Sequence, residues 1–468
     1  MSMGLSRCLV LLCAALVFGS APAPAQEEKP KAAPEKAAQE EPKEPGKDEK
    51  APEKPEESPY LAVLGGDVYT VSDEVIPGGT VLIKKDRILK VGRDVRLPEG
   101  ARTLDASGMR VYPGLVAVNA NGLIAGGNKA RDSFDPFTLN VDLGLAGGLT
   151  TAQAGNAAGK LTRGTLDGHL LSPSVWISLT YSSTAPATRR KLREDLDKAR
   201  ELLRLQRDHE TAKSLGETEA KPPSEEGVNK DYVKLLKGEA MARFNADSLG
   251  ALLAVCELLE EYPMRAVVFG GQEAWACAPR LGRAGARLVI TPRDKAWADE
   301  RLNRPSGWTI ENARLLHEAG VEFAILPQEQ FISTGGITGR DLLTLPLEAA
   351  FAIRGGLPQA AALRAITLDA AKCLGLEDRV GSIEPGKDAD LIITDGDLFD
   401  YRSFVQWAVV NGRVAYDKQK APYFAHIRPR AEPPTPEQLL EEIQRAAEAQ
   451  KQAQEPAPEP PAPDEPPF

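Results

Sequence analysis

Histidine is the residue type that this sequence most lacks. There are four in 468 residues, and they lie far apart along the chain. A protein-bound zinc or iron centre commonly takes several imidazole ligands, so the sequence offers little material for one. His209, His317 and His426 fall in a charged insertion, an expected helix and a C-terminal extension. His169 lies near an expected loop of the main fold, where a lone histidine is more often structural than a ligand.

Cysteine is also scarce, with five in the chain. Cys8 and Cys13 belong to the N-terminal segment, which leaves Cys256, Cys277 and Cys373. An odd number of widely spaced cysteines excludes a disulfide framework and a zinc knuckle. One disulfide remains an alternative, but we expect three buried thiols.

Positive charge is in deficit, with 57 Lys and Arg residues against 67 Asp and Glu residues. The resulting net charge of −10 argues against a nucleic-acid partner. The N-terminus nevertheless begins with Arg7 and an apolar run over residues 9–18, followed by Ala23-Pro24-Ala25. This order is typical of a secretory signal peptide, here residues 1–25, and the run is too short to span a bilayer as a helix. We therefore expect export to the periplasm or the extracellular space and no stable membrane span. A membrane anchor is the alternative.

Residues 26–58 contain no Val, Ile, Leu or aromatic residue and are rich in Pro, Glu, Lys and Ala. Such a segment cannot bury enough apolar surface to offset its ordering entropy, so we expect a disordered linker. Residues 421–468 form a C-terminal extension. Within it, Thr435-Pro436-Glu437-Gln438 predicts the start of a short helix, and a disordered Pro-rich tail follows.

The folded body is expected between these two ends. Short β-type runs broken by Gly, Asp and Pro fill residues 60–104, and a second set follows at 391–416, where Asn411-Gly412 predicts a hairpin turn. Between the two sets, strand-like and helical runs alternate, which predicts an α/β fold built on a (β/α)8 TIM-type barrel. The expected barrel strands are residues 115–119, 149–152, 175–179, 265–269, 287–290 and 322–326.

A charged insertion interrupts the expected barrel at about residues 187–225. Leu192, Leu196, Ala199 and Leu203 make one apolar stripe on an otherwise charged helix. We expect a surface helix packed on the barrel, with a partner-binding helix as the alternative.

Several segments together resemble the amidohydrolase superfamily, and in particular its imidazolonepropionase-like branch. The most specific is the run from Ala365 to Leu391, which includes Gly386-Lys387-Asp388-Ala389-Asp390. Looser matches are Tyr112-Pro113-Gly114-Leu115, Ala146-Gly147-Gly148-Leu149-Thr150-Thr151, and Gly238-Glu239 with the later Asn245-Ala246. The resemblance covers about residues 60–420. It implies a barrel over 113–377 and a small β-sandwich built from the flanking residues 59–112 and 378–420.

The same resemblance implies hydrolysis of C–N bonds at one or two divalent metals such as zinc, and here the sequence departs from the family. Asn119 and Asn121 stand at the His-x-His positions, Asn245 at the strand-five His, Gln272 in the strand-six region and Gln328 at the strand-eight Asp. A neutral amide is a weak ligand for zinc. We therefore expect no metal cofactor and propose that these five side chains contact a small polar ligand at the barrel mouth.

Other chemistries have weaker support. Residues 335–340 are Gly-rich but lack the Lys-Ser/Thr of a P-loop, which favours a loop at the active face over a phosphate site. Residues 182–184 (Ser-Ser-Thr) have no His or Asp partner nearby in sequence. A metal-free acid/base pair could come from two of the carboxylates near expected strand ends, which are Glu239, Glu273, Asp294 and Asp299.

Two hypotheses follow from these patterns. The first is an exported, non-catalytic homologue that binds a ligand or pairs with an active amidohydrolase paralogue or with a second copy of itself. The alternative is a hydrolase of C–N bonds, non-peptide or dipeptide-like, with an atypical site.

Overall fold

A computed structural model describes residues 58–124, 133–181, 185–215, 222–333 and 339–426. The expected signal peptide, nearly all of the linker, the C-terminal helix and tail, and residues 182–184 lie outside the described residues. So does most of the Gly-rich loop. By its internal contacts the chain divides after Glu56, and every described residue belongs to the second unit.

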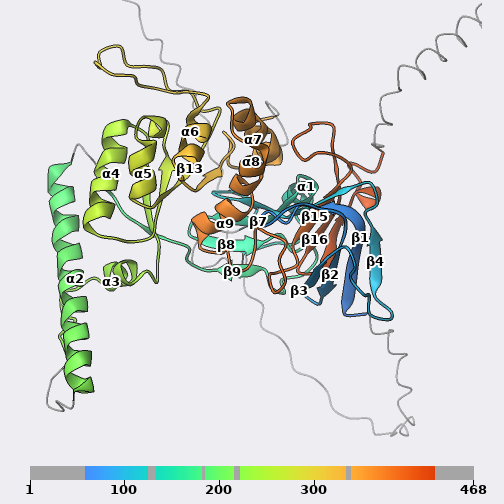
Figure 1. Ribbon diagram of the computed structural model, residues 1–468, viewed down its shortest axis with the longest axis horizontal. Coiled ribbons are helices and arrows are strands. Elements are labelled where there is room, and N and C mark those ends of the chain that lie inside the picture. The colour runs from blue at the N-terminus through green and yellow to red at the C-terminus, as the bar shows by residue number, and fades with distance from the viewer. Residues whose placement is uncertain (1–57, 125–132, 182–184, 216–221, 334–338, 427–468) are drawn as a thin grey trace, which may run out of the picture. The chain divides into compact units, whose positions relative to one another are not determined.

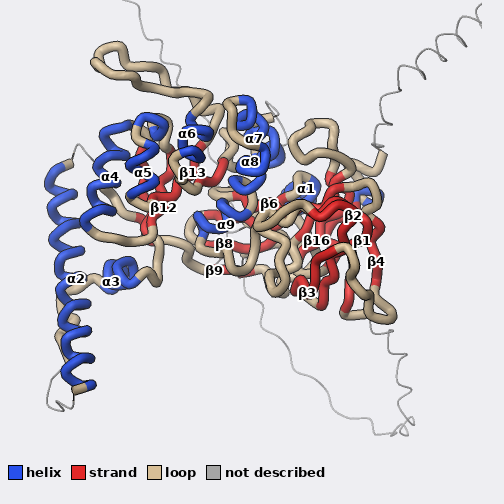
Figure 2. Tube along the Cα trace, in the orientation of Figure 1, coloured by secondary structure: helices blue, strands red, loops and turns tan. Residues whose placement is uncertain are grey.

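The two β-rich flanks join in one eight-stranded sheet, in which β5 (Arg110–Pro113) pairs antiparallel with β15 (Leu391–Thr394). The remaining strands come from both flanks and include the neighbouring red segments of Figure 2: β1 (Tyr60–Val68), β2 (Ile76–Lys84), β3 (Arg87–Gly92), β4 (Arg102–Asp105), β16 (Val405–Val410) and β17 (Arg413–Asp417). The pairing is that of a single continuous sheet, so a sandwich of two facing sheets remains a prediction. The expected Asn411-Gly412 turn does connect β16 to β17.

The central part of the chain is α/β, as expected, but its strands form two sheets instead of one closed ring. One is parallel throughout: β10 (Ile177–Ser178), β11 (Ala242–Ala246), β12 (Ala266–Gly270), β13 (Ala286–Ile290) and β14 (Phe323–Ile325). The other contains β6 (Leu115–Ala117), β7 (Leu149–Ala154), β8 (Ala157–Lys160) and β9 (Leu170–Ser172).

The interruption of the ring has a local cause. Strand β7 pairs with β6 on one side and antiparallel with β8 on the other, so neither edge remains for β10. The link to the parallel sheet is made instead by the Val175 N–H, which donates to the Asn156 carbonyl at 2.9 Å. Sequence alternation alone did not reveal this hairpin, because β8 and β9 are short and carry few β-type residues.

Helices follow the strands of the parallel sheet (Figure 1). Helix α4 (Leu249–Glu261) is capped by Ser248, whose hydroxyl accepts from the Ala251 N–H, and it buries its apolar face. The others are α1 (Leu139–Ala146), α5 (Ala278–Arg283), α6 (Asn312–Glu318), α7 (Leu345–Arg354), α8 (Gln359–Ala365) and α9 (Leu368–Leu374). Cys256, Cys277 and Cys373 are free and buried, as the sequence predicts.

The charged insertion contains the long helix α2 (Pro186–Ser214), which lies beside α3 (Lys230–Lys237) in Figure 1. Its buried stripe is Leu192, Leu196, Ala199 and Leu202, so the predicted Leu203 is one position off and only half-buried. The Tyr262 hydroxyl, just after α4, donates to Asp197 at 2.8 Å. The insertion thus contains the expected helix with one buried face, and partner binding by this helix stays a prediction. None of the helices in the described ranges has the length and apolarity that a bilayer crossing requires.

A buried charge cluster joins β8 to the sheet of the flanks. The Lys160 side chain is fully buried, and its ammonium lies 2.6 Å from Asp388 and 2.9 Å from Asp390. It also donates to the Asn411 side chain, whereas Arg87 and Arg379 pair with Asp388 from the outside. The Gly-Lys-Asp-Ala-Asp run that carries the family resemblance is therefore a structural junction in this chain.

Candidate functional site

A cavity of about 320 Å³ opens at the carboxyl ends of β11, β12 and β13. Enzymes with barrel folds place their active sites at this end of the strands. Three of the five predicted ligand-contact residues line it: Asn119, Asn245 and Gln272. Their contact with a ligand remains a prediction, but the structure does bring them together.

Asn119 is held in place by its backbone as well as its side chain. Its φ of 55° lies in the left-handed region, which asparagine tolerates better than most residues. Its N–H donates to the side-chain carbonyl of the buried Gln153 at 2.7 Å. Its side-chain amide donates to Gln330, a cavity residue that the sequence reasoning missed.

Asn121 and Gln328 do not line the cavity. Asn121 is exposed, and its N–H donates to the Gln330 carbonyl at 2.6 Å. The Gln328 side chain donates to the Arg293 carbonyl at 3.3 Å. Because β14 ends at Ile325, the alternation of a strand no longer applies beyond it, and the sequence could not distinguish Gln328 from Gln330 as the inward residue.

Two carboxylates share the cavity with these amides. Asp247 follows β11 directly, and Asp294 accepts a hydrogen bond from the Gln272 side chain at 3.0 Å. Burial raises the pKa of Asp247, the charge of Asp294 raises it further, and the Gln272 N–H opposes both effects. Asp294 was among the carboxylates expected near a strand end, whereas Asp247 was not identified.

Gly270 makes room for the Asp247 carboxylate. Its φ is +106°, and a Cβ at this position would lie 2.1 Å from Asp247 Oδ1. Only glycine satisfies both the backbone conformation and this close approach. The Phe269-Gly270-Gly271-Gln272 segment thus positions an acidic side chain, which its sequence alone did not indicate.

Arg243 is the cation of this cavity and also lines a second cavity at the amino ends of the strands; sequence reasoning missed it as well. Its guanidinium lies over the rings of Phe269, at 4.2 Å from the centroid, and Trp176, at 5.5 Å. Its Nε is buried without a hydrogen-bond partner, and no carboxylate pairs with the group among the described residues. Burial lowers the pKa of the guanidinium. The alternation of β11 could have placed this side chain beside Asn245, since the two are separated by two positions.

The other carboxylates considered from sequence have structural partners or lie elsewhere. Glu273 accepts from the N–H groups of Leu249 at 2.8 Å and Gly307 at 2.7 Å, and it pairs with Arg304. These contacts hold the pKa of Glu273 below its usual range, against the effect of burial. Asp299 pairs with its neighbour Arg301 at 2.9 Å.

His169 is a core residue. Its ring stacks on Phe134 with the centroids 3.7 Å apart, and Nδ1 lies 2.7 Å from the Lys160 carbonyl. Burial lowers the pKa of the imidazole, which keeps it neutral. The expected structural role of His169 is confirmed by these contacts.

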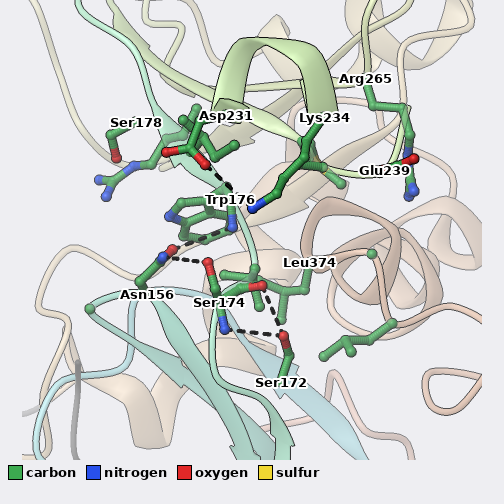
Figure 3. A pocket seen from close by; sticks show the side chains of 18 residues that line it. Asn156, Ser172, Ser174, Trp176, Ser178, Asp231, Lys234, Glu239, Arg265 and Leu374 are labelled. Carbon is green, nitrogen blue, oxygen red and sulfur yellow. Dashed lines mark hydrogen bonds and ion pairs between the residues drawn. The ribbon is translucent and has the colours of Figure 1, made fainter. Parts of the chain in front are cut away.

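A second, larger cavity of about 870 Å³ lies at the amino ends of β10, β11 and β12 (Figure 3). Lys234 and Asp231 lie beside Trp176 there, with Ser172 and Ser174 nearby. Glu239, another of the carboxylates considered from sequence, also lines this cavity. The smaller cavity is the better candidate site, because it occupies the catalytic end of the fold and contains the predicted residues.

The donors around the candidate site do not fit a zinc ion. Across the described ranges, no three His, Cys, Asp or Glu side chains form a group that could hold a metal. The cavity offers amides and two carboxylates, one of which is engaged by Gln272. Arg243 adds to the same cavity a positive charge that forms no ion pair among the described residues, and that charge opposes the binding of a dication.

Comparisons with known proteins place this geometry in a wider context. The model of the Amidohydrolase family matches residues 287–424, from β13 to just beyond β17. The chain is 26% identical to an imidazolonepropionase from Sphingopyxis alaskensis over 377 residues, which are 72% of this chain and 90% of that protein.

A shorter match, 33% identical over 136 residues, is to adenine deaminase 4 of Rhizobium meliloti and covers 28% of this chain and 20% of that protein. The crystal structure of an amidohydrolase from Thermotoga maritima aligns with a TM-score of 0.58 at 23% identity, covering 76% of this chain and 100% of the other. This last likeness supports the fold.

Proposed function

The chain belongs to the amidohydrolase superfamily, and from that premise we propose that it binds a small polar ligand without the metal ions of the family. In this proposal the protein is a non-catalytic homologue. The ligand occupies the cavity at the carboxyl ends of β11–β13, and Asn119, Asn245 and Gln272 provide its amide contacts.

One observation carries the proposal: the candidate site contains an unpaired arginine where the resemblance implies a metal ion. Arg243 lies two residues before Asn245, the residue at the strand-five histidine position. A guanidinium and a dication in one small cavity repel each other, whereas a guanidinium and several amides suit a polar organic ligand.

A second candidate function is hydrolysis of a C–N bond by Asp247 and Asp294. Its support is the raised pKa of Asp247, which is the property that a general acid or base requires near neutral pH. In this alternative Asp247 would exchange a proton with the substrate or with water. The negative charge of Asp294 would keep the pKa of Asp247 raised.

Metal analysis and turnover assays separate the two functions from each other and from ordinary metal-dependent catalysis. The full chain is expressed in medium with added zinc, purified and dialysed, and its metal content is measured by mass spectrometry. The same preparation is then assayed against amide and dipeptide libraries. Ligand binding without catalysis predicts far less than about one zinc ion per chain and no turnover. Chelator-sensitive turnover with stoichiometric zinc would overturn the proposal. Metal-independent turnover that Asp247→Asn abolishes would favour the second candidate.

Export and assembly complete the proposal. An N-terminal signal over residues 1–25 would deliver the protein to the periplasm or the extracellular space. There it would act alone, as a homo-oligomer or as the partner of an active paralogue. Cell fractionation tests the first point. Co-purification with a paralogue, together with light scattering of the isolated protein, tests the second.

A further inference from the structure

The half-buried Arg243 packs on the inner side of the parallel sheet against several apolar side chains. The side chains around it include Trp176, Val267 and Phe269, all of which are buried. Strand register explains the grouping, because Asn245 of β11 pairs with Phe269 of β12 and Arg243 pairs with Val267. Arginine is therefore a costly choice at this position, where an apolar residue would pack equally well.

The cost is not offset within the described part of the chain. Most buried arginines pair with a carboxylate, as Arg293 does with the fully buried Glu348 at 2.6 Å. Arg243 has only the faces of two aromatic rings, and these contacts stabilise a cation without satisfying its N–H groups. A planar guanidinium with free donors at the wall of a cavity is suited to a planar anion.

We propose that Arg243 is the specificity-determining residue of the candidate site and binds the carboxylate of a small ligand. The inference rests on the proposed ligand-binding function and adds the chemical class of the ligand. Arg243 lines both cavities, and the inference assigns the anion to the cavity at the carboxyl ends of the strands, where Arg243 lies with Asn245 and Gln272.

The charges along β11 orient such a ligand. Arg243, Asn245 and Asp247 occupy alternate positions, so they succeed one another at steps of about 7 Å toward the carboxyl end. The cation lies farthest from the carboxyl end, the amide follows, and the two carboxylates lie beyond the end of the strand. A ligand with a carboxylate at one end and N–H groups at the other matches this order, whereas the reverse orientation would place its carboxylate against Asp247 and Asp294.

The test compares two ligands that differ only in this charge. N-acetylglycine carries a carboxylate, and N-acetylglycinamide replaces it with an amide of nearly the same shape. We expect the full-length protein to bind N-acetylglycine about 10- to 100-fold more tightly in calorimetric or NMR titrations. Inorganic phosphate, an anion of different shape, should bind more weakly than the carboxylate.

Arg243→Met should lose the preference for N-acetylglycine. Its melting temperature without ligand should equal or exceed that of the wild type, because a partly desolvated charge without a carboxylate partner has been removed. Arg243→Lys keeps the charge but not the planar fork and should retain part of the preference. Lys234→Met is the matched control, since Lys234 lines only the cavity at the amino ends of the strands and should leave binding unchanged.

Three results would overturn the inference: no discrimination between the two ligands by the wild type, full discrimination by Arg243→Met, or phosphate binding as tight as that of the carboxylate. A loss of binding in Lys234→Met with retention in Asn245→Leu would assign the anion to the other cavity and also overturn it. If turnover depends on zinc and the preference for N-acetylglycine still depends on Arg243, the proposed function is refuted but the inference about Arg243 stands.

Discussion

Replacement of Lys160 by methionine should reduce the free energy of unfolding by about 3–5 kcal/mol. The ammonium is fully buried between Asp388 and Asp390, and its removal does not affect the two carboxylates equally. Asp388 keeps Arg87 and Arg379. Among the described residues, Asp390 keeps the Asn411 N–H at 2.8 Å but no cation, so its charge is left unpaired there.

This loss is a large fraction of the total free energy of unfolding of a domain, which is about 5–15 kcal/mol. Guanidinium chloride denaturation measures it, with Lys198→Met as the matched control. Lys198 forms an exposed ion pair with Asp195 on α2, and its replacement should cost less than about 1 kcal/mol. The double variant Lys160→Met, Asp390→Asn should recover part of the loss, because the stranded carboxylate has been neutralised.

If Lys160→Met costs no more than Lys198→Met, the buried cluster does not join the two sheets energetically, and the reasoning is wrong. Acid sensitivity gives a second measure. Burial alone would raise the pKa of Asp388, but Lys160 and Arg379 hold it below its usual range. The stability that this carboxylate contributes is therefore present above about pH 4 and lost as the pH falls through the lowered pKa.

Three further predictions concern the site and the core. Gly270→Ala should destabilise the protein by about 1–3 kcal/mol and displace Asp247. Gly285→Ala, at a positive φ of 67° with open space for a Cβ, should cost less in the same denaturation assay. Asp247→Asn should stabilise the protein at neutral pH and not at low pH, because a raised pKa makes the ionised form unfavourable above it; equal effects at both pH values in thermal unfolding would contradict this. For His169, whose pKa is lowered by burial, stability should decline as the pH falls below about 6.5, and a decline of the same size in His169→Phe would assign it to other groups.

The sequence predicted the parts of the fold that depend on local patterns. Strand-like runs predicted β7, β12 and β13, and helical spacing predicted α2. The join of the two flanks followed from the family resemblance. The β7–β8 pairing was missed, because a stretch as plain as Ala157-Ala158-Gly159-Lys160 forms a strand only by virtue of its neighbours.

The candidate site was predicted less completely than the fold. Asn119, Asn245 and Gln272 were found because the resemblance gives positions for metal ligands. Arg243 and Asp247 lie two residues before and after Asn245. The resemblance gives a metal-ligand position for Asn245 and none for these two neighbours, so it did not point to them. Asn119 has a left-handed backbone conformation, and its side chain donates a hydrogen bond to Gln330. Both residues lie in loops, whose conformation no sequence periodicity predicts.

The pairing of β5 with β15 also governs how the chain can be made. Some 280 residues separate Val111 from Ile393, its partner in the register, so β15 leaves the ribosome long after β5. Closing so long a loop is entropically slow, so until β15 has been made the first five strands expose an unpaired edge. An exposed edge invites aggregation, and a chain truncated before residue 391 should therefore be bound by chaperones or degraded, and it should not accumulate as a folded protein.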